Sequence, residues 1–206
     1  MAYTRMPITS EKKRSSGMKT YLVGGAVRDL LLNLSIKDVD IEVYNLQPEV
    51  VEKILRQFGP VSLVGKVFGV FRVHGLDVDW SLPRADSPGR KPEVKIDPFM
   101  SYHNAFVRRD LTINAMGIDL STSELIDPFN GVHDVKKKIL RSPDTRFFIQ
   151  DPLRFYRVMQ FIGRFEMVPD EKLDTLCSRM DISDVSRERI EQEFKKLLLK
   201  SVRPSK

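Results

Sequence analysis

The sequence contains little cysteine and histidine, which limits the chemistry available to the chain. Cys177 is the one cysteine in 206 residues, so no disulfide forms within the chain, as is typical of a reducing compartment. His74, His103 and His133 lie far apart and lack the spacing of zinc ligands. No Ser/His/Asp or Cys/His pattern indicates a covalent nucleophile. The sequence therefore favours neither a zinc protein nor covalent catalysis of these types.

Long apolar runs are also missing. No segment approaches the roughly 18–20 apolar residues that span a bilayer, and the sequence does not open with the apolar stretch of a secretory signal peptide. Hydrophobic residues make up 41% of the chain, which is enough to bury the core of one substantial domain and a smaller one. We therefore expect a cytoplasmic location and no membrane partner.

The net charge of +6 is concentrated at the two ends of the chain. Residues 1–17 carry a net charge of +3 and residues 195–206 a net charge of +5, which leaves −2 for the stretch between them. Basic ends of this kind attract a polyanion or are simply solvated tails. Residues 1–17 are predicted to be a flexible basic leader or an artificial extension, ahead of a natural start at Met18.

Hydrophobic periodicity predicts an α+β fold without internal repeats. We expect a mixed head domain over residues 18–140, a helical extension over 141–200 and a basic tail over 201–206. The predicted strands lie at 19–23, 38–44, 61–82 and 117–126, those within 61–82 being consecutive and antiparallel. The predicted helices begin after the glycine pair and at 48, 108, 151, 170 and 186, with Ser186 as a possible cap, while 84–106 is predicted to be a long loop.

Asp38 and Asp40 form the most informative local pattern. They are separated by one residue on a predicted strand, so both carboxylates point to the same side. Two neighbouring acids repel each other unless a cation lies between them. Oxygen ligands of this type suit Mg²⁺, which also takes substrate phosphates and water. The pattern alone is weak, because most such pairs are surface acids.

Gly24 and Gly25 lie between a predicted strand and a predicted helix. Such a turn exposes backbone N–H groups at a helix N-terminus, where phosphate binds readily, and Arg28 adds a positive charge. An ordinary strand-to-helix turn is the alternative. The segment is not a P-loop, since no Gly-Lys-Ser/Thr sequence follows. A phosphate turn followed by an acidic strand favours a nucleoside triphosphate site.

Asp79 lies on a later predicted strand and is a candidate for a third carboxylate. It would accept a proton from an attacking hydroxyl or complete the metal shell. Asp77, two residues earlier, is the alternative for this role. Two-metal phosphoryl transfer needs about three acids and a triphosphate, and no covalent nucleophile.

Seven segments occur in an order that resembles a known family. They are LVGGAVRDLLL (22–32), KDVDIEV (37–43), GKVFGVFRV (65–73), DWSLPR (79–84), RRDLTINAM (108–116), DPFNGVHDVKKKILR (127–141) and QDPLRFYRVMQF (150–161). The order resembles that of the class II tRNA nucleotidyltransferases, or CCA-adding enzymes, and their bacterial poly(A) polymerase relatives. The likeness covers about residues 18–200 and implies a polymerase-β-like head followed by a helical neck.

The resemblance also implies residue roles. Asp38 and Asp40 match the metal-binding pair, and 84–106 matches the flexible catalytic loop. The implied substrate-binding residues are Gly24, Gly25 and Arg28 for the triphosphate, Arg108, Arg109, Asp110 and Asn114 in the motif that contacts sugar and phosphates, and Asp151, Arg154 and Arg157 for the incoming base. Arg189 matches the motif that closes the neck.

The implied reaction is attack of an RNA 3′-hydroxyl on the α-phosphate of CTP or ATP, with Mg²⁺ as the cofactor and tRNA as the expected RNA. Two departures stand out: Gln150 replaces the usual glutamate before Asp151, and the chain ends just after the neck. The chain is therefore a minimal enzyme, a fragment, or a protein needing a second copy or a partner. Poly(A)-type, CC-only or A-only addition, and an idle RNA-binding module, are the alternatives.

Overall fold

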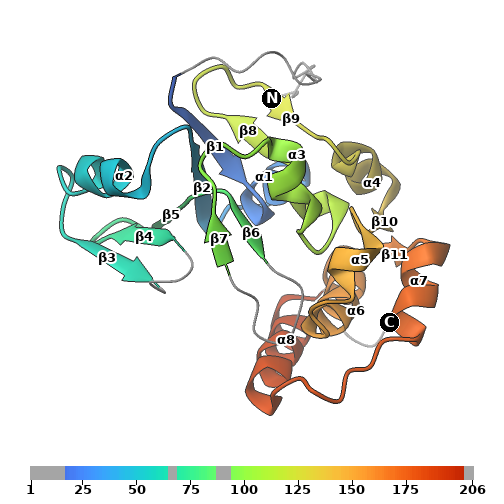
Figure 1. Ribbon diagram of the computed structural model, residues 1–206. Helices are drawn as coiled ribbons and strands as arrows, with labels where there is room; N and C mark the ends of the chain where they lie inside the picture. Colours follow the sequence, from blue (N-terminus) through green and yellow to red (C-terminus); the bar gives the residue numbers. More distant parts are fainter. Residues whose placement is uncertain (1–16, 65–68, 87–93, 202–206) are drawn as a thin grey trace.

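The structure, a computed structural model, describes residues 17–64, 69–86 and 94–201. All but the last residue of the predicted leader (1–17) and all but the first residue of the predicted basic tail (201–206) lie outside these ranges. A mixed sheet with helices packed on it forms the first part of the chain, and a group of helices follows beside it (Figure 1). The expected α+β architecture is confirmed. Within the described residues, no helix is both long and apolar enough to cross a membrane.

Seven strands form the main sheet in the order β3-β4-β5-β2-β1-β8-β9. Neighbouring strands are antiparallel except β2 and β5, which run parallel and place Asp40 opposite Asp79. The strands are β1 (Lys19–Val23), β2 (Val39–Tyr44), β3 (Val61–Val64), β4 (Val70–Val73), β5 (Val78–Ser81), β8 (Gly117–Asp119) and β9 (Leu125–Ile126).

The alternation along β2 gives the sheet two unlike faces. Asp40, Glu42 and Tyr44 point to one side, which we call the acidic face, while Ile41 and Val43 point to the opposite face. Helix α3 (Tyr102–Val107) packs against Tyr44 and its β1 neighbours on the acidic face. Helix α2 (Pro48–Leu55) packs its apolar side on Ile41 and Val43 from the opposite face.

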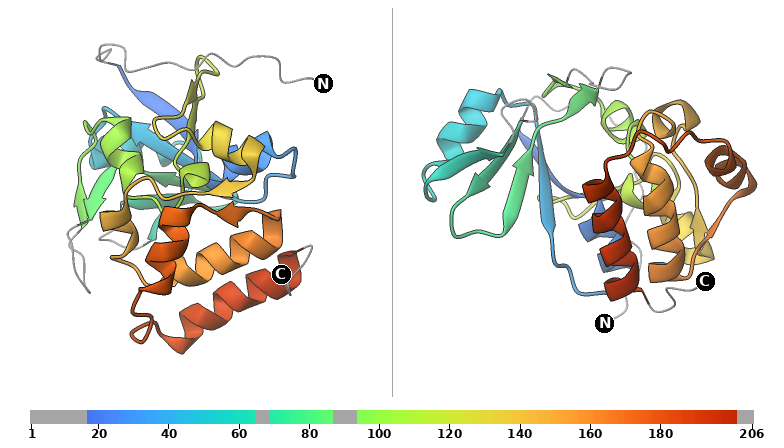
Figure 2. Two further views of the ribbon diagram at one scale, coloured as in Figure 1. Left: turned by 90° about the vertical axis from the view of Figure 1, so that its right-hand side faces the viewer. Right: turned by 90° about the horizontal axis from the view of Figure 1, so that it is seen from below.

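The remaining helices bring the two parts of the chain together. They are α1 (Gly25–Leu31), the 3-10 turn η1 (Thr112–Asn114), α4 (Gly131–Lys137), α5 (Thr145–Phe148), α6 (Leu153–Phe165), α7 (Glu171–Ser178) and α8 (Arg187–Lys200). Helices α6 and α8 lie side by side (Figure 2). One core cluster contains Val27 of α1, Leu111, and Phe161 and Phe165 of α6, so head and neck share buried apolar surface.

Several predicted elements need correction. The segment 84–106 is not one long loop, because it contains the antiparallel pair β6 (Arg84–Asp86) and β7 (Val94–Ile96), and also α3. The predicted helix from 108 is only the single turn η1, and α4 was not expected. The neck is not wholly helical, since β11 (Val168–Pro169) pairs with β10 (Ile139–Leu140). Ser186 occupies the N-cap position of α8 without a side-chain capping bond.

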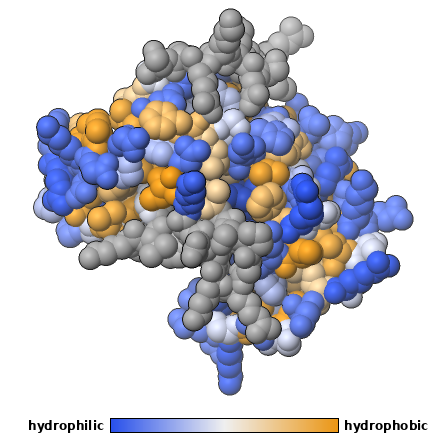
Figure 3. Space-filling model, viewed as in Figure 1, coloured by the Kyte–Doolittle hydropathy of each residue, from blue (hydrophilic) through white to orange (hydrophobic). Residues whose placement is uncertain are grey.

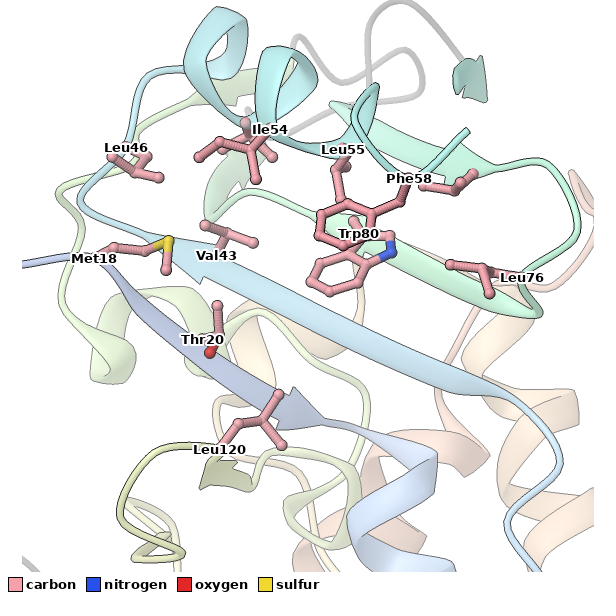
Figure 4. Close-up of a pocket in the computed structure, with 12 residues that line it drawn as sticks. Met18, Thr20, Val43, Leu46, Ile54, Leu55, Phe58, Leu76, Trp80 and Leu120 are labelled. Carbon is pink, nitrogen blue, oxygen red and sulfur yellow. The ribbon is translucent and has the colours of Figure 1, made fainter. Parts of the chain in front are cut away.

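An apolar pocket of about 420 Å³ opens between α2 and the sheet face opposite the acids. Ile54 and Leu55 of α2 face Val43 of β2 and Trp80 of β5 across it (Figure 4). Hydrophobic side chains also surface over the α2–β4 side of the molecule (Figure 3). None of the described residues that line the pocket is ionisable, so its chemistry differs from that of the acidic face.

Candidate active site

The two predicted metal ligands lie at the beginning of β2. Asp40 is the second residue of the strand and partly buried, whereas Asp38 precedes the strand and is exposed. Burial raises the pKa of Asp40, Asp79 and Asp38 raise it further, and Arg109 opposes them. The predicted cluster of like charges around Asp40 is therefore present in the fold.

Asp79 lies beside Asp40 but is engaged elsewhere. The parallel register of β2 and β5 sets the two residues opposite each other. Both carboxylate oxygens of Asp79 accept from Arg72, at 2.6 Å from Nε and 2.7 Å from Nη2. Asp77, the alternative, is exposed and precedes β5. The role of Asp79 as a third carboxylate stays a prediction, and each of its oxygens keeps a lone pair beyond its bond to Arg72.

The glycine turn brings Gly24 next to Asp40 and Arg109. Gly24 has a φ of +70°, and a Cβ placed on it would lie 2.9 Å from Nη1 of Arg109 and 3.9 Å from Oδ2 of Asp40. Only glycine suits this backbone conformation and this close approach. The N–H of Gly24 donates to the carbonyl of Met116 at 3.2 Å, so this N–H is not offered to a phosphate as the sequence predicted.

Glu42 is a site residue that the sequence did not single out. It lies two residues after Asp40 on the acidic face and is only 1% exposed. Its Oε2 accepts from the Tyr44 hydroxyl at 2.9 Å and lies 3.8 Å from Nη2 of Arg109. Arg108 reaches Oε1 at 4.0 Å. The sequence signal that could have identified Glu42 is its spacing, because it follows Asp38 and Asp40 at the same interval of two residues. Glu42 orients Arg108 and Arg109, the two arginines predicted to contact the phosphates.

Asp110, Asn114 and Arg157 form one connected group. Asp110 Oδ1 accepts from Asn114 Nδ2 at 2.9 Å, and Asp110 Oδ2 accepts from Arg157 Nε at 2.7 Å. Burial alone would raise the pKa of Asp110, but the Arg157 guanidinium and these hydrogen bonds hold it at about 2. Asp110 and Asn114, predicted to meet the substrate, therefore contact the neck through Arg157.

Asp151 and Arg154 lie where the head meets the neck. Arg154 donates to the carbonyls of Phe147 and Arg108, both at 2.6 Å, and so ties the first turn of α6 to the head. Asp151 Oδ1 accepts from the N–H of Leu153 at 3.1 Å, and Nη2 of Arg189 contacts both carboxylate oxygens. Arg189 thus links α8 to the residue just before α6, and its role in closing the neck stays a prediction.

Arg28 is not at the surface of the glycine turn. The whole residue is only 5% exposed, and its guanidinium bonds to Asp29 and Asn114. A Cβ added to Gly25 would meet this guanidinium at 3.3 Å. In this structure the Arg28 guanidinium is therefore not exposed for the predicted contact with the triphosphate.

The acidic face fits a divalent cation held by few protein ligands. Among the described residues, no group of three or more His, Cys, Asp or Glu side chains is placed to hold a metal. Asp38 and Asp40 offer carboxylate oxygens. Burial raises the pKa of Asp40 and the neighbouring carboxylates raise it further, and a bound cation would offset both effects. Mg²⁺ commonly binds through one or two carboxylates, with waters and substrate phosphates completing its shell. The donor set therefore suits such an ion.

Comparison with known proteins identifies the family. The model of the poly A polymerase head domain matches residues 20–141, more than half of the chain. The chain belongs to the poly A polymerase head domain family. The match begins within β1, contains the glycine turn, Asp38, Asp40 and Arg108–Asp110, and ends just after β10. Nucleotidyltransferases of this family typically use a divalent metal.

Curated relatives of this head domain extend the likeness into the neck. The "Multifunctional CCA protein" of Janthinobacterium sp. (strain Marseille) is 36% identical over 198 residues, which is 92% of this chain and 46% of that protein. That of Herminiimonas arsenicoxydans is 40% identical over 152 residues, which is 72% of this chain and 35% of that protein. The chain thus spans at most about half the length of these relatives.

A solved structure confirms the polymerase-β-like head followed by helices. The Bacillus stearothermophilus CCA-adding enzyme in complex with CTP superposes with a TM-score of 0.74 and 30% identity. The superposition covers 88% of this chain and 45% of that one. The head domain and the start of the neck therefore share one arrangement in both proteins.

Proposed function

We propose that the protein is a template-independent RNA nucleotidyltransferase that adds C and A nucleotides from CTP and ATP to the 3′ end of an RNA, with tRNA as the substrate. The observation that carries the proposal is the meeting of Asp40, Gly24 and Arg109 on the acidic face. The CCA proteins among the relatives, and the solved CCA-adding enzyme with CTP, support the substrate class. A cytoplasmic location, self-association and the division at residue 140 stay predictions.

The proposed reaction divides its tasks among few residues. The RNA 3′-oxygen bonds to the α-phosphorus, the bond to the β-phosphate oxygen breaks, and pyrophosphate leaves. Asp38 and Asp40 would hold Mg²⁺, which when bound offsets the charge of the triphosphate. Arg108 and Arg109, oriented by Glu42, would contact the sugar and phosphates. Asp79 is the predicted acceptor of the hydroxyl proton.

Base choice is proposed to rest on Asp151 and Arg154. Cytosine and adenine both present an amino donor beside a ring-nitrogen acceptor, whereas uracil and guanine present a carbonyl beside an N–H. A carboxylate only accepts and a guanidinium only donates, so the pair complements C and A. In the structure these groups bind Arg189 and two backbone carbonyls. Base selection therefore requires them to exchange these partners for the nucleotide.

Incubation with labelled CTP, ATP, UTP or GTP, Mg²⁺ and tRNA lacking its 3′ end tests the proposal. We expect incorporation of C and A and poor use of U and G. Incorporation of A alone, or of C alone, would narrow the activity to a poly(A)-type or partial enzyme. No incorporation, with tRNA still bound, would replace the proposal with an idle RNA-binding module.

A further inference from the structure

The apolar pocket opposite the acidic face has an exposed rim. Four of its lining side chains are each between 46% and 71% exposed: Met18, Phe58, Leu76 and Leu120. Single exposed apolar side chains are ordinary on a protein surface, but these four surround one cavity. Apolar side chains gathered in this way commonly mark an interaction site. The rim is therefore a candidate surface for binding other apolar groups.

The walls of the pocket define the chemistry of its occupant. Ile54 and Leu55 of α2 form one wall, and Val43 of β2 and Trp80 of β5 lie across from them (Figure 4). A charged group would lose its hydration here without gaining a partner, because none of the described lining residues is ionisable. The volume of about 420 Å³ lies within the range of roughly 300–1,000 Å³ that small ligands occupy. The pocket therefore suits a few apolar side chains and not an RNA phosphate.

The chain that precedes Met18 leaves from the edge of this pocket. Met18 lines the pocket, and the carbonyl of Gly17 accepts from Nδ2 of Asn45 at 3.0 Å. Asn45 in turn directly precedes Leu46, another lining residue. Residues 1–16 lie outside the described ranges, but they join the described chain at this point. The leader is thereby tethered to the rim of the pocket.

The sequence of the leader divides into an apolar half and a polar half. Its apolar side chains all lie within residues 1–8, namely Met1, Ala2, Tyr3, Met6, Pro7 and Ile8, whereas residues 9–17 have none. Pro7 favours an extended backbone at Met6, and residues two apart in an extended segment point to the same side. Met6 and Ile8 can therefore enter one pocket together.

The polar half has the length of a short linker. A flexible chain of nine residues, such as 9–17, spans roughly 15–18 Å on average. A linker of this kind holds the attached segment at an effective concentration in the millimolar range. Even weak binding of the apolar half to the pocket is then sufficient.

We propose that residues 1–8 of the leader bind in the apolar pocket of the same chain, with Met6 and Ile8 as the anchors. The tether favours the leader over a second copy of the chain, because a second copy would first lose its translational and rotational freedom. Binding of the leader covers apolar side chains that otherwise promote association between molecules. The pocket lies on the face opposite Asp40, so this binding does not depend on the proposed reaction.

Methyl NMR of the full chain tests the contact directly. We expect nuclear Overhauser effects between the methyl groups of Met6 and Ile8 and the indole of Trp80, the single tryptophan of the sequence. L76K places a charge on the pocket rim and should abolish these signals. L63K is the matched control and should retain them, because Leu63 of β3 is similarly exposed but does not line the pocket. Absence of these signals in the wild type would overturn the proposal.

Binding of the apolar dye anilinonaphthalene sulfonate measures independently whether the pocket is covered. We expect M6S/I8S to bind more dye than the wild type, because the pocket is then open. K12S/K13S, which changes only the polar half of the leader, should bind dye as the wild type does. A peptide of residues 1–16, added at millimolar concentration, should displace the dye from M6S/I8S.

Two outcomes of the dye experiment contradict binding of the leader. Equal dye binding by the wild type and M6S/I8S would show that the leader does not cover the pocket. Dye binding that falls in both proteins as the protein concentration rises would assign the pocket to a second copy of the chain instead.

Discussion

Asp40 and Asp110 are acids in the same site region, yet their surroundings shift their pKa values in opposite directions. Burial and neighbouring carboxylates raise the pKa of Asp40. Asp110 is buried too, but one guanidinium and an amide bond its two oxygens, so its pKa falls to about 2. The folded chain therefore disfavours the charge on Asp40 and stabilises the charge on Asp110.

Replacement of Asp38 or Asp40 with asparagine tests the metal site. We expect each change to abolish nucleotide addition, because a neutral amide is a poor ligand for a hard cation. The melting temperature of Asp40→Asn should equal or exceed that of the wild type without metal, since a repelled carboxylate is removed. Glu49→Gln, on α2 at the opposite face, is the control and should keep wild-type activity. A doubly substituted enzyme with a near wild-type rate would refute the assignment.

Acid unfolding tests the state of Asp110. A folded pKa of about 2 lies below the usual 3.8, so the charged carboxylate stabilises the fold above about pH 4. This contribution, on the order of 2 kcal/mol, is lost as the pH falls toward 2. The free energies of unfolding of the wild type and Asp110→Asn should therefore converge by that amount between pH 5 and pH 2. Glu188→Gln changes an exposed residue and is the control, so its free energy of unfolding should follow that of the wild type at every pH. A difference between Asp110→Asn and the wild type that stays constant with pH would contradict the ion pair of Asp110.

Among the elements, strands and long helices were predicted more reliably than short turns. The alternation over 38–44 predicts β2 because one side of the strand is buried and the other carries acids. Helix α6 follows from the apolar residues at helical spacing between 153 and 162. The turn η1 and the strands β10 and β11 are too short to show a period, so only tertiary packing defines them.

The sequence predicted which residues gather near the site better than it predicted their partners. Asp40 and Asp79 meet because β2 and β5 pair in parallel, which their spacing does not reveal. Arg28 and Asn114 are 86 residues apart, and Asp110 and Arg157 are 47 apart. Residue types alone cannot tell whether a buried arginine faces a phosphate or an internal carboxylate. That choice depends on how α6 packs against α1.

The N-terminal end of α6 provides a test of base selection. Asp151→Ala removes a capping acceptor, which should lower the unfolding free energy by about 1 kcal/mol. If the carboxylate also selects the base, incorporation of C and A should fall. The ratio of CTP to UTP incorporation should then decrease about tenfold or more. Arg189→Met is the matched variant, because it breaks the same ion pair but keeps Asp151. An unchanged ratio of CTP to UTP incorporation in Asp151→Ala would leave Asp151 as a cap alone.

At the scale of the whole molecule, the charge distribution predicts how RNA is held. The basic residues at the end of the chain include Arg203 and Lys206. A plot of the logarithm of the RNA-binding constant against the logarithm of the salt concentration has a negative slope. Deletion of residues 201–206 should reduce the size of this slope by roughly one to two, about one for each RNA phosphate that the tail neutralises. Binding titrations over a salt series measure this slope. An equal slope in the truncated chain would show that the tail is merely solvated.

Trp80 is the single tryptophan of the sequence, and its indole lines the apolar pocket while the preceding Asp79 pairs with Asp40 across the sheet. Its emission therefore reports on the head alone, because the neck helices contain no tryptophan. Far-ultraviolet circular dichroism, in contrast, is weighted toward helices, including α6 and α8 of the neck. Thermal melts followed by the two signals will coincide as long as head and neck unfold as one cooperative unit. The two melting curves will separate in any variant in which head and neck unfold independently. The comparison of the two signals therefore measures the cooperativity between head and neck.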